Sequence, residues 1–339
     1  MDNTVNNENE LEPERPPHPP LYEQLYPTSH QLSPTVVPYD GFVADIDARS
    51  IFDIIEKSDK MSLIMLLTNR SNLQRVEICE KYKSIYNKDL IVDLKSILSG
   101  DLKDLIISMM TPLPIFYAKE LNLSIDGTIK NDSVLIEILC TLSKKEINIV
   151  KNEYKKLYNK VLEEDIHDTC TKFKRLMVSL CCANRDVNMT INIESAINDA
   201  KKLLNFDTNN NDANVFNDIF VRRNELQLKK IFHEYEKISG HSIETTIKKE
   251  FSGDMKKALI CIVKCVNNRA VFFAEQLYKS MIGLGTDDRS LQRLILTRSE
   301  IDMGEIKQIF QTQYNDTLEN FIIDDCSGHY KKCLLALIN

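Results

Sequence analysis

The chain contains the segment QRVEICEKY at residues 74–82, and the same alternation of apolar and charged residues returns three more times. The later copies read EINIVKNEY at 146–154, LKKIFHEY at 228–235 and EIKQIF at 305–310. Each copy has an aromatic residue at the same place, and these lie 72, 81 and 75 residues apart: Tyr82, Tyr154, Tyr235 and Phe310. A regular period of this length is typical of a repeat protein. The sequence therefore predicts four units of roughly 70 residues each.

Each unit continues in the same way, with a polar turn, a further helix, a turn of small residues and an apolar helix. In the first unit the small turn is 98–100, and Leu102, Leu105, Ile106 and Met109 then recur at the spacing of one buried helix face. We expect these last helices at 102–110, 173–183, 255–266 and 330–338, with the serine of each turn as a cap. No sustained two-residue alternation indicates a strand. The sequence predicts an all-α fold, and the longer polar connection at 184–199 suggests that the units pair two and two.

Composition narrows the possible functions. The 339 residues are 43% hydrophobic and carry a net charge of −7, which argues against a basic nucleic-acid binder. Attraction to an acidic membrane would need a bridging cation. Nine cysteines occur without a Cys-x-x-Cys pair, and neither a signal peptide nor a run of about 18 apolar residues is present. We expect a soluble, reduced, intracellular protein.

Residues 1–41 differ from the rest, because they are rich in proline and lack an apolar period. This composition predicts a disordered tail with extended polyproline character. Pro19, Pro20 and Tyr22 form a Pro-Pro-x-Tyr pattern of the kind that WW-type modules bind. The alternative is a solvated spacer.

Another distinctive stretch is Met281-Ile282-Gly283-Leu284-Gly285-Thr286-Asp287-Asp288, and Asp325 follows Gly285 by 40 residues. Glycine lets the backbone adopt conformations that expose its carbonyl oxygens. Backbone carbonyls together with one bidentate carboxylate suit a hard cation such as calcium. The alternative is an ordinary turn between helices, with Asp287 capping the second helix.

Over residues 42–339 the chain resembles the annexin family. The most specific segments are 281–288, 298–303 and 325–330, supported by 67–71, 88–100, 118–121 and 183–186. The resemblance implies a curved disc of four five-helix repeats, with calcium sites on the convex face and the tail on the other. It implies repeats at 42–111, 112–183, 184–268 (including a linker) and 269–339. The implied function is calcium-dependent binding to acidic phospholipid.

Carried over to this sequence, the family's calcium site is complete in the fourth repeat. Its ligands would be the carbonyls of Met281, Gly283 and Gly285 and the carboxylate of Asp325. Ile282 and Leu284 would then be apolar side chains at the tip of the loop, either entering the lipid headgroup region or packing on a neighbouring loop.

In the third repeat, Asn210 takes the glycine position and Glu250 follows it by 40 residues. Asparagine tolerates the left-handed conformation better than most residues, so a second site is expected there. The same run also matches part of an EF-hand loop: Asp207, Asn209, Asn211 and Asp218. Because Asp212 stands where that loop requires glycine, we interpret this match as accidental.

The first two repeats depart from the pattern. The first loop, at 56–61, has no glycine and is about two residues short, and Ile97 stands at the carboxylate position, so no site is expected. The second repeat keeps Asp168, but Ile129 replaces the second glycine. A β-branched residue resists positive φ, so a site there would be distorted.

These observations lead us to expect a cytoplasmic protein that binds membranes peripherally when calcium rises, as an adaptor or organiser. The alternative is a scaffold, largely independent of calcium, that recruits a partner through Pro19, Pro20 and Tyr22. An enzyme is not expected, because the six histidines form no metal-ligand pair and no nucleophile or phosphate-binding motif is present.

Overall fold

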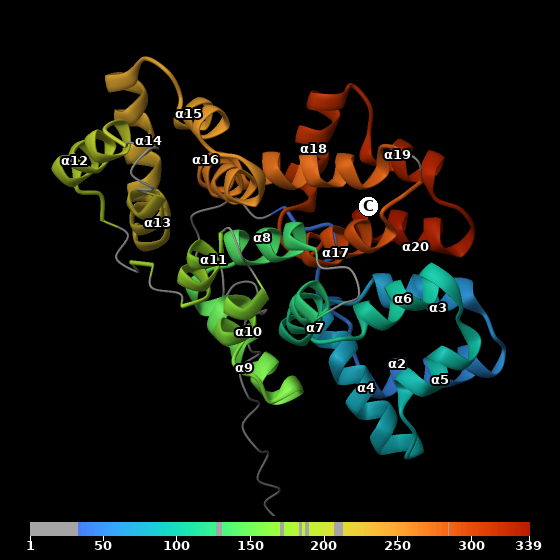
Figure 1. Cartoon of the computed structure of the whole chain (residues 1–339). Helices are drawn as coiled ribbons and strands as arrows, with labels where there is room; N and C mark the ends of the chain where they lie inside the picture. Colours follow the sequence, from blue (N-terminus) through green and yellow to red (C-terminus); the bar gives the residue numbers. More distant parts are fainter. Residues whose placement is uncertain are drawn as a thin grey trace, which may run out of the picture.

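The computed structural model describes residues 33–126, 131–169, 173–182, 185–186, 190–206, 213–283 and 285–339. Within these ranges all the regular structure is helical (Figure 1). The predicted partner motif at Pro19, Pro20 and Tyr22 lies outside the described residues, as does Asn210. No helix in the described ranges is long and apolar enough to cross a membrane.

Each repeat consists of five helices. The first repeat holds α2 (Ala44–Glu56), α3 (Lys60–Thr68), α4 (Asn72–Tyr86), α5 (Leu90–Ile97) and α6 (Gly100–Met109). The second holds α7 (Leu113–Asp126), α8 (Asp132–Thr141), α9 (Lys144–Tyr158), α10 (Leu162–Thr169) and α11 (Lys174–Cys181). The third holds α12 (Ile193–Leu204), α13 (Ala213–Arg222), α14 (Glu225–Ser239), α15 (Ile243–Glu250) and the first part of α16 (Gly253–Met281). The fourth holds the rest of α16, α17 (Asp288–Arg298), α18 (Met303–Tyr314), α19 (Leu318–Asp325) and α20 (Gly328–Ile338).

The long element α16 is two helices joined at Asn268, whose backbone is extended with φ −159° and ψ 109°. The side chain of Asn268 accepts a hydrogen bond from the amide of Val271 at 3.2 Å, which caps the second of the two helices. The chain therefore passes from the third repeat into the fourth without an intervening loop.

The repeated aromatic residues set the register between the third and fourth helices of each repeat. All four are buried, and each contacts the residue eleven positions later. The hydroxyls of Tyr82 and Tyr154 donate to Asp93 and Asp165 at 2.8 Å, Tyr235 lies 2.7 Å from the Thr246 hydroxyl, and the ring of Phe310 packs on Phe321 with centroids 5.1 Å apart. This shared contact makes the four fourth helices directly comparable, residue by residue.

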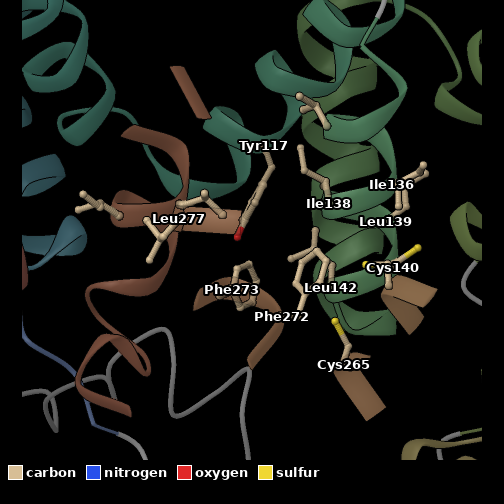
Figure 2. Packing of buried hydrophobic residues seen from close by; sticks show 14 of the residues in the cluster. Tyr117, Ile136, Ile138, Leu139, Cys140, Leu142, Cys265, Phe272, Phe273 and Leu277 are labelled. Atoms are coloured by element: carbon tan, nitrogen blue, oxygen red, sulfur yellow. The ribbon is translucent and has the colours of Figure 1, made fainter. Parts of the chain in front are cut away.

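The repeats do pack in pairs, but the pairing brings together the two ends of the chain. Helix α20 packs on α3 and α6, which joins the fourth repeat to the first, whereas α8 of the second repeat packs along α16 (Figure 1). Figure 2 shows side chains of α7, α8 and α16 gathered in one apolar core, among them Tyr117, Ile138 and Phe273. The length of the connection at 184–199 could not indicate this pairing, which depends on complementary apolar faces.

The serines of the small turns do not cap helices through their side chains. Ser99, Ser252 and Ser327 stand at the N-cap positions of α6, α16 and α20, yet none of their hydroxyls makes a capping hydrogen bond. The following glycines have φ between +58° and +62°, a region that other residues adopt only with strain. The Ser-Gly pairs are therefore turn residues because of their glycines, contrary to our expectation.

The end of the expected disordered tail is ordered. The amides of Thr35 and Val36 donate to the carbonyl of Ser299 at 2.8 and 3.0 Å, and Val36 is only 2% exposed. The Thr35 hydroxyl also donates to the Leu337 carbonyl at 2.7 Å. Residues 33–36 thus form a strap across the fourth repeat, although their composition alone indicates a disordered segment.

Candidate metal site in the fourth repeat

The loop between α16 and α17 has the backbone that a carbonyl-lined site requires. Gly283 and Gly285 have φ of +116° and +87°, and no atom lies within 4 Å of a Cβ built on either of them. Space alone would accept a larger residue, so it is the positive φ that calls for glycine. The amide of Asp287 donates to the Ser280 carbonyl at 2.8 Å and closes the loop.

Asp287 also caps α17, because its carboxylate accepts a hydrogen bond from the amide of Ser290 at 3.1 Å. The two interpretations of this stretch are therefore compatible. The turn is a capped helix–helix connection and, at the same time, a glycine loop with outward-facing backbone.

Asp325 is the last residue of α19 and is exposed. The hydroxyl of Thr286 donates to Oδ2 of Asp325 at 2.9 Å, which ties the loop to a carboxylate 39 residues further along. Among the described residues, no hydrogen bond to Oδ1 is present. The tertiary structure therefore brings the predicted loop and the predicted carboxylate together, with ligand capacity to spare.

The surroundings of this loop are acidic. Burial raises the pKa of the Asp288 carboxyl, against a hydrogen bond from Tyr330 that lowers it. Neighbouring carboxylates raise it further: Asp101, Asp287 and Asp325. Such a concentration of negative charge attracts a cation.

Ligand type points to a hard cation. The search of the described residues found no group of three or more His, Cys, Asp or Glu side chains arranged to hold a metal. A site with one carboxylate must therefore take most of its ligands from backbone carbonyls and water, which is a donor set for calcium rather than for zinc or copper. The residues present fit calcium.

Two apolar side chains flank the site on the surface. Ile282, in the loop, and Ile323, in the last turn of α19, are each 45% exposed. Leu284, the other apolar residue expected at the loop tip, lies outside the described residues.

The family model described as Annexin matches four segments that follow these repeats: 47–109, 116–180, 198–262 and 272–337. The chain belongs to the annexin family. The expected family and the all-α, four-repeat fold are thereby confirmed. Annexins bind calcium and, as a family, bind phospholipid in a calcium-dependent manner; they are generally not enzymes.

Relatives and solved structures agree with this assignment. The chain is 42% identical to annexin A6 of Gallus gallus over 308 residues, which is 89% of this chain and 46% of the relative. It is 39% identical to human annexin A4 over 308 residues, 89% of this chain and 97% of the relative. The chain spans only 46% to 62% of the length of several A6 and A7 relatives that it matches.

Among solved structures, annexin III superposes with a TM-score of 0.87 at 35% identity, covering 90% of this chain and 96% of that one. A calcium-bound annexin (Sm)1 superposes with a TM-score of 0.84 at 32% identity, covering 91% and 94%.

In the first repeat of this annexin, the equivalent loop is shorter and has no carboxylate opposite it. The amide of Asp59 donates to the Ile54 carbonyl, a span two residues shorter than that between Ser280 and Asp287. Ile97 ends α5 as Asp325 ends α19, four residues after the position contacted by the aromatic residue. An apolar side chain therefore occupies the place of the carboxylate, as the sequence predicts.

In the second repeat, the carboxylate is out of register. The loop has the full span, because the amide of Asn131 donates to the Ser124 carbonyl at 3.2 Å, although residues 127–130 lie outside the described part. Counting four residues on from Asp165, the partner of Tyr154, leads to Thr169 rather than Asp168. One residue corresponds to about 100° of helix rotation, so Asp168 starts from a different face of its helix than Asp325 does. A count along the sequence missed this, since one residue is deleted within the repeat.

In the third repeat, Glu250 is in register with Asp325. It ends α15 four residues after Thr246, it is half-buried, and it pairs with Lys249 at 3.3 Å. Its predicted companion, Asn210, lies outside the described residues. Helix α13 already begins at Ala213, where an EF-hand loop ending at Asp218 would still be running, which agrees with our interpretation of that match as accidental.

Proposed function

We propose that this annexin binds calcium in the fourth-repeat loop and uses that calcium to dock onto acidic phospholipid as a peripheral membrane adaptor. The carbonyls of Met281, Gly283 and Gly285 and the carboxylate of Asp325 are the proposed ligands. The observation that carries this proposal is the hydrogen bond that holds Thr286 to Asp325, because it joins the two halves of the ligand set.

Charge explains why calcium is needed. The chain has a net charge of −7, so an acidic membrane repels it at long range. A cation whose remaining coordination positions face outward can accept lipid phosphate oxygens while it is held by the loop. The exposed side chains of Ile282 and Ile323 would then lie against the headgroup region.

A second, weaker site is proposed in the third repeat, from Asn210 and Glu250. Two sites on one rigid disc bind one surface with avidity, but with less cooperativity than four sites would give. We propose no calcium ligand in the first repeat, and we withdraw Asp168 of the second repeat because of its register. The cytoplasmic location, with membrane association when calcium rises, belongs to the same proposal.

The test is co-sedimentation with phosphatidylserine vesicles over a calcium titration. Asp325→Ala is expected to shift the midpoint to much higher calcium, and the adjacent Asp324→Ala, which changes the same exposed charge, is the matched control. Equal midpoints for Asp325→Ala and the wild type would contradict the proposal. Recruitment of a partner through Pro19, Pro20 and Tyr22 stays a prediction from the sequence.

A further inference from the structure

The carboxylate of Asp325 lies in a position that is unfavourable for a negative charge. It stands at the C-terminal end of α19, where the helix dipole is negative. The carboxylates of Asp287 and Asp288 are also nearby, since both Asp287 and Asp325 raise the pKa of Asp288. Asp325 is exposed, so packing does not restrain its rotamer. Left to itself, this side chain would turn away from the acidic loop.

One group on the loop opposes that tendency. The Thr286 hydroxyl donates to Oδ2 of Asp325 at 2.9 Å and lies 3.5 Å from the Asp325 carbonyl oxygen. A hydroxyl has a single proton, so this bond orients Oδ2 and still leaves it a lone pair, with Oδ1 available for a metal. The carboxylate is therefore held without being used up as a ligand.

The donor itself is rigidly placed. Threonine is branched at Cβ and has few χ1 rotamers. Thr286 follows Gly285, whose φ is +87°, and precedes Asp287, whose amide closes the loop on Ser280. A change in the loop backbone is thus transmitted directly to the orientation of the carboxylate on α19.

The first repeat shows the arrangement without this contact. Ser58 precedes the capping Asp59 as Thr286 precedes Asp287, but the residue opposite is Ile97, which has no acceptor. The hydroxyl contact is therefore found where the carboxylate is found.

We propose that Thr286 is a positioning residue that orients the Asp325 carboxylate for calcium and so sets the calcium affinity of the fourth repeat. The inference rests on the function proposed above. Removing a hydrogen-bond partner behind a metal ligand typically costs 10- to 100-fold in metal affinity. A loss of this size, about 10- to 100-fold, is expected when the hydroxyl is removed.

The experiment compares calcium affinity in Thr286→Val, which keeps the shape but loses the hydroxyl, with Thr286→Ser, which keeps the hydroxyl. Calcium binding is measured by isothermal titration of the full chain, and the calcium midpoint of vesicle co-sedimentation gives a second readout. Thr312→Val is the matched control, because that exposed threonine only donates to the Gln308 carbonyl within its own helix, at 2.9 Å.

The expected result is a large loss of affinity in Thr286→Val, most of which returns in Thr286→Ser, with Thr312→Val unchanged. Thermal unfolding without calcium should be the same for all of them, which separates positioning from stability. If Thr286→Val lowers the unfolding temperature, the comparison of Ser with Val still decides, since only the hydroxyl differs in function.

Two results would overturn the inference: wild-type affinity in Thr286→Val, or an equal loss in Val and Ser. Asp325→Ala is measured in parallel to separate the two proposals. If it binds calcium as well as the wild type, the proposed function fails. If it loses binding while Thr286→Val keeps it, only the role of Thr286 fails.

Discussion

The hydroxyl of Ser33 accepts a hydrogen bond from the backbone amide of Glu305 at 2.8 Å, across 272 residues of sequence. The N-cap of α18, Asp302, makes no capping bond of its own, because its carboxylate pairs with Arg298 at 2.6 and 2.8 Å. Ser33 therefore caps this helix from the opposite end of the chain. The strap lies so close that a Cβ on Gly304 would come within 2.9 Å of the Ser33 carbonyl oxygen.

Replacing this cap should lower stability. We expect Ser33→Ala to reduce the free energy of unfolding by about 1 kcal/mol, the usual cost of losing a serine cap. Chemical denaturation of the full chain measures it. Ser50→Ala, which removes a hydroxyl bonded only to the Ile46 carbonyl within α2, should change it much less. Equal stability of the two variants would show that the Ser33 contact contributes nothing.

A buried ion pair joins the fourth repeat to the second. Arg293 of α17 is 2% exposed, and its guanidinium donates to both oxygens of Glu137 at 2.9 Å and to Glu120 at 3.3 Å. Arg293→Met should destabilise the fold by about 3–5 kcal/mol, because it leaves buried carboxylates without their partner.

The control for this prediction is the neighbouring Arg289, which also donates to Glu120 but whose side chain is 52% exposed. Arg289→Met should cost at most about 1 kcal/mol, as solvent screens exposed pairs. Denaturant unfolding of both variants tests the contrast, and a small loss in Arg293→Met would contradict it.

The register of α10 leads to a prediction of no effect. Asp168→Ala should leave the calcium midpoint of vesicle binding unchanged, since the helix position that corresponds to Asp325 is Thr169. Asp325→Ala, assayed under the same conditions, shows that the assay detects a lost ligand. A shifted midpoint in Asp168→Ala would mean that the second repeat does bind calcium.

The third repeat should contribute partially. Glu250→Gln is expected to raise the calcium midpoint moderately, and to abolish vesicle binding only together with Asp325→Ala, because two sites act by avidity. Glu244→Gln, which removes a carboxylate from the same helix where it pairs with Lys248, serves as the control. An unaltered midpoint in Glu250→Gln would leave a single working site.

Much of this protein could be predicted from local signals. The four copies of the Tyr82 segment have the period of a repeat, and their three- and four-residue apolar spacing predicts helices, both of which the structure confirms. The resemblance to annexins rests on short contiguous motifs and is confirmed as well. Gly283 and Gly285 also act locally, because a positive φ is a property of one residue and its neighbours.

Other features could not be predicted in this way. The Ser-Gly turns led to a wrong expectation, because a serine in the N-cap position caps only if its rotamer reaches the amides, and here it does not. The off-register position of Asp168 became visible only when the Tyr154–Asp165 contact aligned the helices. A deletion of one residue hardly alters a sequence count, yet it turns a side chain about 100° around a helix.

The sequence by itself determined the helices, the repeats, the family and the glycine loop, because each depends on residues close together in the chain. Only the tertiary structure decided which repeats pack together, that Ser33 caps α18, that Arg293 joins Glu120 and Glu137, and that Thr286 holds Asp325. Those contacts join residues 39 to 272 positions apart. Their geometry depends on how buried apolar faces pack, and no local pattern in the sequence encodes that.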